Sequence, residues 1–179
     1  MENKFIVSSS PHIRSNEDTS YIMKQVILAL VPVAIAAVYY FRISALFVMF
    51  FCILGTVGSE FLYQKLTKQK STIGDCSAIV TGLLLAFNVP ASLPWWMCIL
   101  GGVFAIIVVK MLFGGLGNNF VNPALAGRAF LLASFPVAMT AWTKTGVNWV
   151  SGGSLDAVST ATPLSFLKSG AAGLQGLTD

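Results

Sequence analysis

FGGLGNNFVNPA, residues 113–124, lies between two long apolar runs and decides how this chain can fold. The segment holds three glycines, three asparagines and one proline, all of which are poor residues for the interior of a helix. Inside a membrane, backbone that is not helical is tolerated only where protein or a water-filled cavity covers it. If the flanking runs lie in a membrane, the segment predicts a break that lines a cavity, with asparagine amides available for hydrogen bonding. A polar loop between two spans is the alternative.

The composition places the flanking runs in a membrane. The chain has 179 residues, of which 55% are hydrophobic and 10% charged, and its mean hydropathy is +0.76. An ordinary soluble domain carries roughly 25% charged residues. The composition therefore predicts an all-α polytopic membrane protein, embedded in the lipid bilayer as a bundle of transmembrane helices.

Neither the charge nor the cysteines indicate a nucleic-acid or metal site. The net charge is +4, and the basic residues lie in segments that flank the apolar runs, where membrane topology explains them. We therefore expect no nucleic-acid partner. Cys52, Cys76 and Cys98 form no CxxC pair and lie in or beside apolar runs. They are expected to be reduced core residues, and no metal site is predicted.

The chain divides into three regions. Residues 1–22 form a polar segment, 23–140 an apolar region, and 141–179 a loop-like region rich in small residues. The first apolar run begins near Ile22, is too long for a signal-peptide core and lacks a cleavage site, so it is expected to remain as a span. About five membrane segments are expected, over residues 23–41, 43–62, 75–87, 95–109 and 124–138.

Basic residues predict the orientation of these segments. Lys65, Lys68 and Lys70 follow the second span, and basic residues near span ends favour the cytoplasmic side. The N-terminal segment is therefore expected in the cytoplasm. By alternation Lys110 is also cytoplasmic, and residues 141–179 emerge on the opposite side. Pro32 is expected to kink the first span.

The segment 75–87 is too short to cross a membrane as a straight helix. Asp75 or Ser77 is expected to cap its start, and residues 88–90, Asn-Val-Pro, stop it. Ser77 and Thr81 lie four residues apart and so share one helix face. Short, glycine- or proline-bounded segments are typical of broken helices that point one end at a ligand; a short or tilted ordinary span is the alternative.

Arg128 is the charged residue of the last apolar segment. An arginine there is costly and usually faces an interior, a cavity or an anion, such as the electron-rich ring of a flavin or a carboxylate. Extension of the side chain to the cytoplasmic surface is the alternative. Broken or re-entrant helices with Asn-Pro-Ala turns predict a scaffold resembling transporters of the urea or ammonium type.

Four sequence blocks, taken in order, resemble the RnfD/NqrB family. Residues 113–124 with GRAF at 127–130 resemble its FGGxGxNxFNPA…GRAF block, and DCSAIVTGLLL at 75–85 resembles its D-x-SA-x-x-TG-x-LL segment. SSSPH at 8–12 resembles its N-terminal block, and STAT at 159–162 resembles its S-G-A-T flavinylation motif. The short N-terminal segment is more similar to RnfD than to NqrB.

The resemblance implies a covalent FMN. In the family the last threonine of the motif, here Thr162, is esterified to the FMN phosphate by a separate flavin transferase. Asp156, Ser159 and Ala161 would position this loop, which would lie outside the cytoplasm. Thr160 stands where the family has glycine, and a β-branched residue tolerates fewer backbone angles than glycine.

The resemblance also implies the function. The chain would be a subunit of an Rnf complex in the cytoplasmic membrane of a bacterium or archaeon, a redox-driven translocase that couples ferredoxin:NAD oxidoreduction to transport of Na⁺ or H⁺. Ferredoxin and NAD would bind partner subunits, since the chain carries no Rossmann motif and no iron–sulfur ligand set. The length corresponds to roughly the N-terminal half of the family's subunit. A second flavin, FMN or riboflavin, is expected near the polar residues of the broken segments: Ser77, Thr81, Asn118, Asn119, Asn122 and Arg128.

Two alternatives remain open from the sequence. The first is that the chain is an NqrB-like subunit of a Na⁺-pumping NADH:quinone oxidoreductase, and the second is that it is a solute channel of the urea or ammonium type. A response to ubiquinone or menaquinone would favour the first. Conduction of a neutral solute by ligand-free protein would favour the second.

Overall fold

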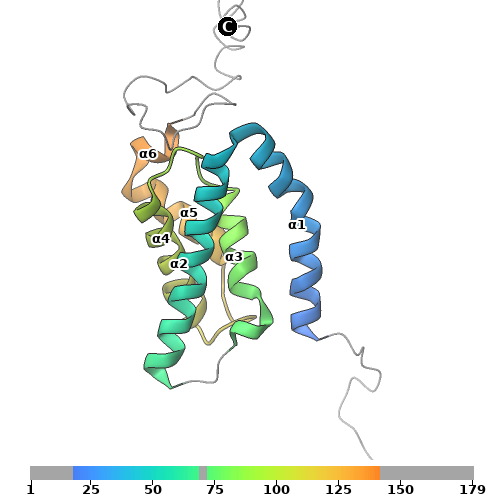
Figure 1. Cartoon of the computed structure of the whole chain (residues 1–179). Coiled ribbons are helices and arrows are strands. Elements are labelled where there is room, and N and C mark those ends of the chain that lie inside the picture. The colour runs from blue at the N-terminus through green and yellow to red at the C-terminus, as the bar shows by residue number, and fades with distance from the viewer. Residues whose placement is uncertain (1–17, 69–71, 142–179) are drawn as a thin grey trace, which may run out of the picture.

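The computed structural model describes residues 18–68 and 72–141, and this part of the chain is helical without strands. Figure 1 shows α2, α3, α4 and α5 packed as a bundle, with α1 standing at one side. The predicted all-helical fold is confirmed. The elements in chain order are α1 (Thr19–Phe41), α2 (Ile43–Thr67), the 3₁₀ turn η1 (Ile73–Asp75), α3 (Ser77–Ala86), α4 (Trp95–Val103), the π-helix η2 (Phe104–Met111), α5 (Pro123–Ser134) and α6 (Pro136–Thr140).

α1 and α2 are the two described helices that are long and apolar enough to cross a membrane. α1 has 23 residues, which at 1.5 Å per residue gives about 35 Å, enough for a hydrocarbon core of about 30 Å. It begins earlier than the expected residue 23, because the Asp18 carboxylate caps it by accepting a hydrogen bond from the Thr19 N–H at 2.8 Å. Pro32 lies inside α1, and Figure 1 shows the later part of this helix turned toward α2.

The bundle is held together at positions where small residues let helices approach closely. A Cβ atom on Gly82 of α3 would lie 2.6 Å from Thr56 Oγ1 of α2, and one on Gly127 of α5 would lie 2.9 Å from the Gly101 carbonyl oxygen of α4. Close backbone approach at small residues is a common way for membrane helices to associate. Glycine at these places therefore sets the spacing of the bundle.

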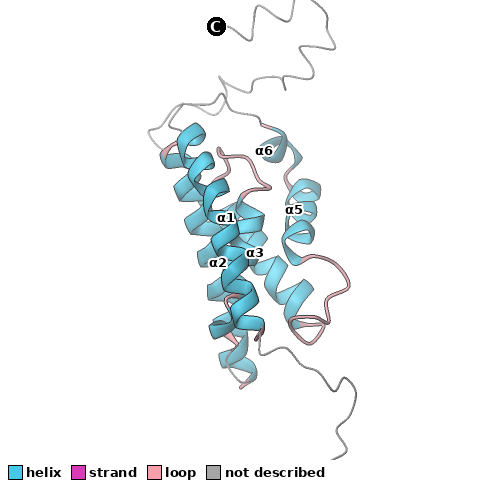
Figure 2. Ribbon diagram, turned by 90° about the vertical axis from the view of Figure 1, so that its right-hand side faces the viewer, coloured by secondary structure: helices cyan, strands magenta, loops and turns pink. Residues whose placement is uncertain are grey.

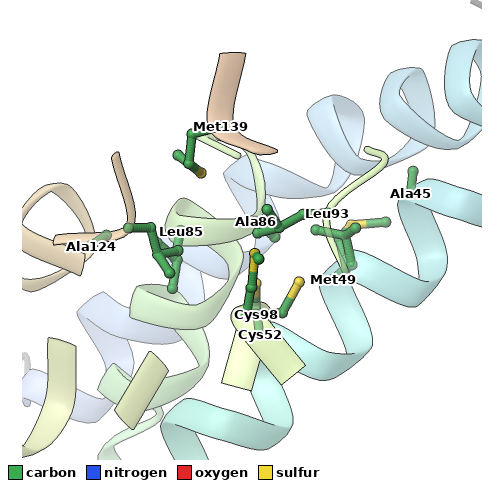
Figure 3. Packing of buried hydrophobic residues seen from close by; sticks show 12 residues of the cluster. Ala45, Met49, Cys52, Leu85, Ala86, Leu93, Cys98, Ala124 and Met139 are labelled. Atoms are coloured by element: carbon green, nitrogen blue, oxygen red, sulfur yellow. The ribbon is translucent and has the colours of Figure 1, made fainter. Parts of the chain in front are cut away.

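The buried apolar core lies where α2, α3, α4 and α5 meet. Figure 3 shows Cys52 of α2 and Cys98 of α4 close to Met49 and Leu93. Cys52, Cys76 and Cys98 are free thiols, and Cys52 and Cys98 are fully buried. The prediction of reduced core cysteines is confirmed for these two; Cys76 is partly exposed and has left-handed backbone angles.

The predicted break at residues 113–124 is a loop from residue 112 to residue 122, which Figure 2 shows leading up to α5. Gly114, Gly115 and Gly117 adopt φ values of 100°, 95° and 90°, a region that favours glycine over residues with a side chain. The next predicted segment, 124–138, is not continuous. It divides into α5 and α6 at Phe135, because Pro136 cannot donate the hydrogen bond that would extend α5.

Candidate functional site

Lys110 and Glu60 form a buried ion pair between η2 and α2. Lys110 Nζ lies 2.8 Å from Glu60 Oε2, and the two side chains are 2% and 0% exposed. Charges are almost never fully buried unless they are paired. A pair in this position is weak evidence for stability, since desolvation offsets much of the attraction. Its presence in an apolar chain points to function.

Lys110 also reaches the start of α3. Its ammonium donates to Ser77 Oγ at 2.6 Å. The Ser77 hydroxyl donates in turn to Asp75 Oδ1 at 2.6 Å, and the same oxygen accepts the Ser77 N–H at 2.8 Å. The N-cap of α3 is Cys76, which makes no side-chain capping bond, so the predicted cap at Asp75 or Ser77 is wrong in position. Asp75 lies one residue earlier and still accepts the first N–H group of the helix, and this contact is continuous with the ion pair. The start of α3 is therefore held against η2 by polar contacts.

The second carboxylate oxygen of Glu60 is satisfied from the segment that follows α2. Glu60 Oε1 accepts hydrogen bonds from Thr72 Oγ1 at 2.8 Å and from Gln64 Nε2 at 3.1 Å. Gln64 Oε1 accepts from the Thr72 N–H at 3.2 Å. With both oxygens engaged, the carboxylate has a defined position and Lys110 a defined partner.

A π-helix places Lys110 in this network. Residues Phe104–Met111 form the π-helix η2, which continues α4. The wide turns persist past its end, where the Leu112 N–H bonds to the Ile107 carbonyl at 3.1 Å and the Gly115 N–H to the Lys110 carbonyl at 2.9 Å. π-helices are rare and are frequently found at functional sites. This local geometry turns the Lys110 side chain into the bundle, where it is 2% exposed.

A cavity of about 370 Å³, here called the polar cavity, opens beside the ion pair. It brings together four of the residues predicted from two separate sequence blocks, Ser77 and Thr81 of α3 with Asn119 and Asn122 of the glycine–asparagine loop. Lys110 also lines it. Its remaining lining is Met23, Val80, Leu84, Leu116, Phe120, Val121 and Pro123.

The polar atoms of this lining differ in what they offer to a ligand. Asn122 Oδ1 is committed to capping α5, since it accepts the Ala124 N–H at 3.0 Å, and Thr81 Oγ1 donates to the Ser77 carbonyl at 2.9 Å. Asn119 Oδ1 is buried and has no hydrogen-bond partner among the described residues. A buried acceptor without a partner costs free energy, so Asn119 is the residue that a donor on a ligand would satisfy.

Two predicted residues lie outside this cavity. Asn118 is exposed, and its Nδ2 donates to the Gly114 carbonyl at 3.4 Å. Arg128 is exposed on α5, where Nη1 donates to Asn88 Oδ1 at 3.2 Å. The residues predicted around the flavinylation motif, Thr162, Asp156, Ser159 and Ala161, lie outside the described residues.

The ion pair of Glu60 and Lys110 was not predicted from the sequence, and neither residue was assigned to the cavity. A signal was present, because an ionisable residue inside an apolar run is a candidate functional residue whose partner should be sought. Within residues 18–68 and 72–141 no group of three or more His, Cys, Asp or Glu residues is arranged to hold a metal ion, so the network is not a metal centre of this part of the chain.

Comparison with known proteins identifies the family. The D subunit of the Na⁺-translocating ferredoxin:NAD⁺ oxidoreductase complex of Acetobacterium woodii is 49% identical over 172 residues, which are 96% of this chain and 52% of that protein. The D subunit of the proton-translocating ferredoxin:NAD⁺ oxidoreductase complex of Clostridium ljungdahlii is 46% identical over 167 residues, 93% of this chain and 49% of that protein. The D subunit of the ion-translocating oxidoreductase complex of Shigella boydii serotype 18 is 46% identical over 140 residues, 77% of this chain and 40% of that protein.

The chain therefore spans about half the length of the curated relatives it matches. Its residues 6–179 match the model of the NQR2, RnfD, RnfE family. That match covers the described helices, both blocks that line the polar cavity, and residues 159–162. This is a membrane protein that belongs to the NQR2, RnfD, RnfE family.

Proposed function

We propose that this chain forms part of the D subunit of an ion-translocating ferredoxin:NAD⁺ oxidoreductase complex, where it holds flavin and relays electrons between partner subunits. The relatives' names support the assignment. The observation that carries it is the polar cavity, in which the chain's two central family blocks meet around a buried lysine and an unsatisfied amide oxygen. The chain supplies binding and electrostatics, whereas the redox chemistry belongs to the cofactor.

Overall sequence identity to the relatives does not determine which ion is transported. The relative from Acetobacterium woodii is named for Na⁺ and that from Clostridium ljungdahlii for protons, and their identities to this chain are 49% and 46%. The proposal is therefore transport of Na⁺ or H⁺. Ion uptake by inverted vesicles, with and without a Na⁺ gradient, would separate the two.

The first flavin of the proposal is an FMN joined to Thr162. The Thr162 hydroxyl would attack the FMN phosphorus of an activated flavin nucleotide held by a flavin transferase and its metal. The new phosphoester bond would form as the bond from that phosphorus to the rest of the donor breaks, and the hydroxyl proton would pass to a base of the transferase. The test is in-gel fluorescence of the denatured protein after co-expression with such a transferase, followed by peptide mass analysis. We expect an FMN-sized addition on Thr162 and a dark band for Thr162→Ala. If the band of the unaltered chain is dark and Thr160→Gly restores its flavin fluorescence, the defect lies at Thr160.

The second flavin of the proposal occupies the polar cavity. The isoalloxazine ring of a flavin is flat and largely apolar, with polar atoms along one edge. Val80, Leu84 and Phe120 offer apolar walls, while Asn119 Oδ1 offers an acceptor for a ring N–H. The cavity volume of about 370 Å³ suits a ring of this size. The residues present therefore fit the group, which when bound would accept and donate electrons.

The remaining parts of the proposal concern topology. The N-terminal segment would be cytoplasmic, the loop with Thr162 extracytoplasmic, and residues 23–140 would supply about five membrane segments. The short α3 and the division of the last segment into α5 and α6 suit a broken-helix scaffold of the urea or ammonium transporter type. Labelling of single cysteines introduced at residues 4 and 162, in intact cells and in lysed cells, would test the orientation.

The experiment that tests the function as a whole uses membranes that carry the assembled complex. Reduced ferredoxin should drive NAD⁺ reduction and ion uptake, and Thr162→Ala should lower both. Activity with NADH and a quinone, in place of ferredoxin, would instead support the NqrB-like alternative. Retention of full ferredoxin-linked activity by Thr162→Ala would contradict the covalent relay.

A further inference from the structure

Lys110 lines the polar cavity but its ionic partner Glu60 does not. The pair is therefore oriented, with its positive end toward the cavity and its negative end behind. We propose that Lys110 sets the reduction potential of the cavity flavin, its ammonium favouring the reduced form and Glu60 limiting how strongly that charge acts. This rests on the proposed occupation of the polar cavity by a flavin.

The ammonium is held in place from both sides. It donates to Glu60 Oε2 at 2.8 Å and to Ser77 Oγ at 2.6 Å, and a lysine ammonium has three donors in all. Two of these donors have partners among the described residues, and Lys110 itself lines the cavity. Ser77 also lines the cavity, so a hydroxyl oriented by the lysine and by Asp75 lies next to the charge.

Burial makes this charge effective. Lys110 is 2% exposed, and a charge in a low-dielectric environment acts more strongly than the same charge in water. Because the hydrogen bonds and the π-helix fix its position, little reorganisation is needed when charge develops nearby, which is the condition for efficient electrostatic stabilisation.

The sign of the effect follows from charge. An electron delivered by a protein donor adds negative charge at the cavity, and an adjacent fixed cation stabilises that charge. The proton of Lys110 stays on Nζ, and no bond to the lysine forms or breaks. Lys110 is therefore expected to raise the potential of the cavity flavin, and Glu60 to moderate the rise.

The test is a redox titration of the assembled complex in a Thr162→Ala background, so that the signal of this chain comes from non-covalent flavin. Glu60→Gln keeps the shape of the side chain and removes its charge, so the potential should rise. Glu60→Gln with Lys110→Met removes both charges, and the potential should fall below that of the parent. The expected shift in reduction potential is about 59 mV for a one-electron couple, which corresponds to a tenfold change in the ratio of reduced to oxidised flavin. Lys110→Arg keeps the charge and should stay near the parent.

A matched control separates a local from a general charge effect. Lys65→Met removes a lysine that is exposed on α2, and it should leave the potential unchanged. If Glu60→Gln fails to fold, the double variant and Lys110→Arg still give different expectations, a lowered potential for the first and the parent's potential for the second. A double variant with the parent's potential, with flavin retained, would overturn the role of Lys110. Parent protein that releases no flavin on denaturation would overturn the occupation of the cavity itself, and the role of Lys110 with it.

Discussion

The polar cavity and a second cavity of the same size show that volume does not reveal which site is functional. Both have volumes of about 370 Å³. The second, here called the apolar cavity, contains no charged residue. It is lined by Val33, Ala36, Ala37, Tyr40, Phe41, Ala45, Val48, Met49, Ala86, Phe87, Val89, Pro90 and Ala91.

The two cavities differ in the free-energy cost of folding the chain around them. The lining of the apolar cavity is made by ordinary helix packing of α1, α2 and the end of α3. The polar cavity keeps a buried charge and an unsatisfied amide oxygen, both of which oppose stability. Features that are costly to fold and absent from the neighbouring cavity are the better guide to function.

The largest predicted effect is on stability when one member of the ion pair is removed. Lys110→Met leaves Glu60 buried and uncompensated, and breaking a buried pair in this way costs about 3–5 kcal/mol. Thermal unfolding in detergent would measure it. Glu60→Gln with Lys110→Met should recover most of the loss, since no charge then remains buried.

Lys65→Met is the matched control for that change. Lys65 lies exposed in the last turn of α2, so its loss should change stability by less than about 0.5 kcal/mol. Equal destabilisation by the two lysine variants would contradict the burial of Lys110.

A second prediction concerns α3, which lines both cavities. Gly82→Ala would place a Cβ 2.6 Å from Thr56 Oγ1 and 2.8 Å from Ile53 Cα of α2, and overpacking of this kind costs about 1–3 kcal/mol. Gly58→Ala in α2 meets nothing within 4 Å and should be neutral or stabilising by about 0.5–1 kcal/mol. Unfolding midpoints that do not separate the two variants would show that α3 does not pack closely on α2.

A third prediction distinguishes two adjacent asparagines. Asn119→Leu removes the buried acceptor of the polar cavity and should weaken binding of non-covalent flavin roughly tenfold, the effect of losing about one hydrogen bond. Asn118→Leu should leave binding unchanged, because the Asn118 side chain is exposed and donates to the Gly114 carbonyl, outside the cavity. Fluorescence titration of flavin-depleted protein with FMN or riboflavin would measure both. Equal losses of flavin affinity in the two variants would mean that binding depends on the loop as a whole rather than on the Asn119 amide oxygen.

A fourth prediction concerns the apolar cavity, where no effect on flavin is expected. Ala37→Leu partly fills it and should change stability by no more than about 1–2 kcal/mol in either direction. Flavin content and potential should be unaffected. A clear loss of flavin from this variant would remove the functional distinction between the two cavities.

Much of the local structure could be predicted because its causes lie close together in the chain. The stop of α3 follows from the Asn-Val-Pro sequence after it. The start of α1 has an equally local cause, the capping carboxylate of Asp18, although the span was expected to begin at residue 23. The non-helical loop at 112–122 follows from glycines that adopt positive φ. The division of the last segment was missed although its signal, Pro136, is equally local.

The sequence by itself determined a helical membrane fold with a break rich in glycine and asparagine, since composition and residue propensities act over a few neighbours. Only the tertiary structure decided that Lys110 pairs with Glu60, 50 residues away. It also decided that Asn119 lies in the cavity while Asn118 lies outside, and that Arg128 binds Asn88. The physical reason is that helix packing and loop backbone angles choose which side chains meet. Neither can be read from residue types alone, whereas the cost of a buried charge could have shown that a partner had to exist.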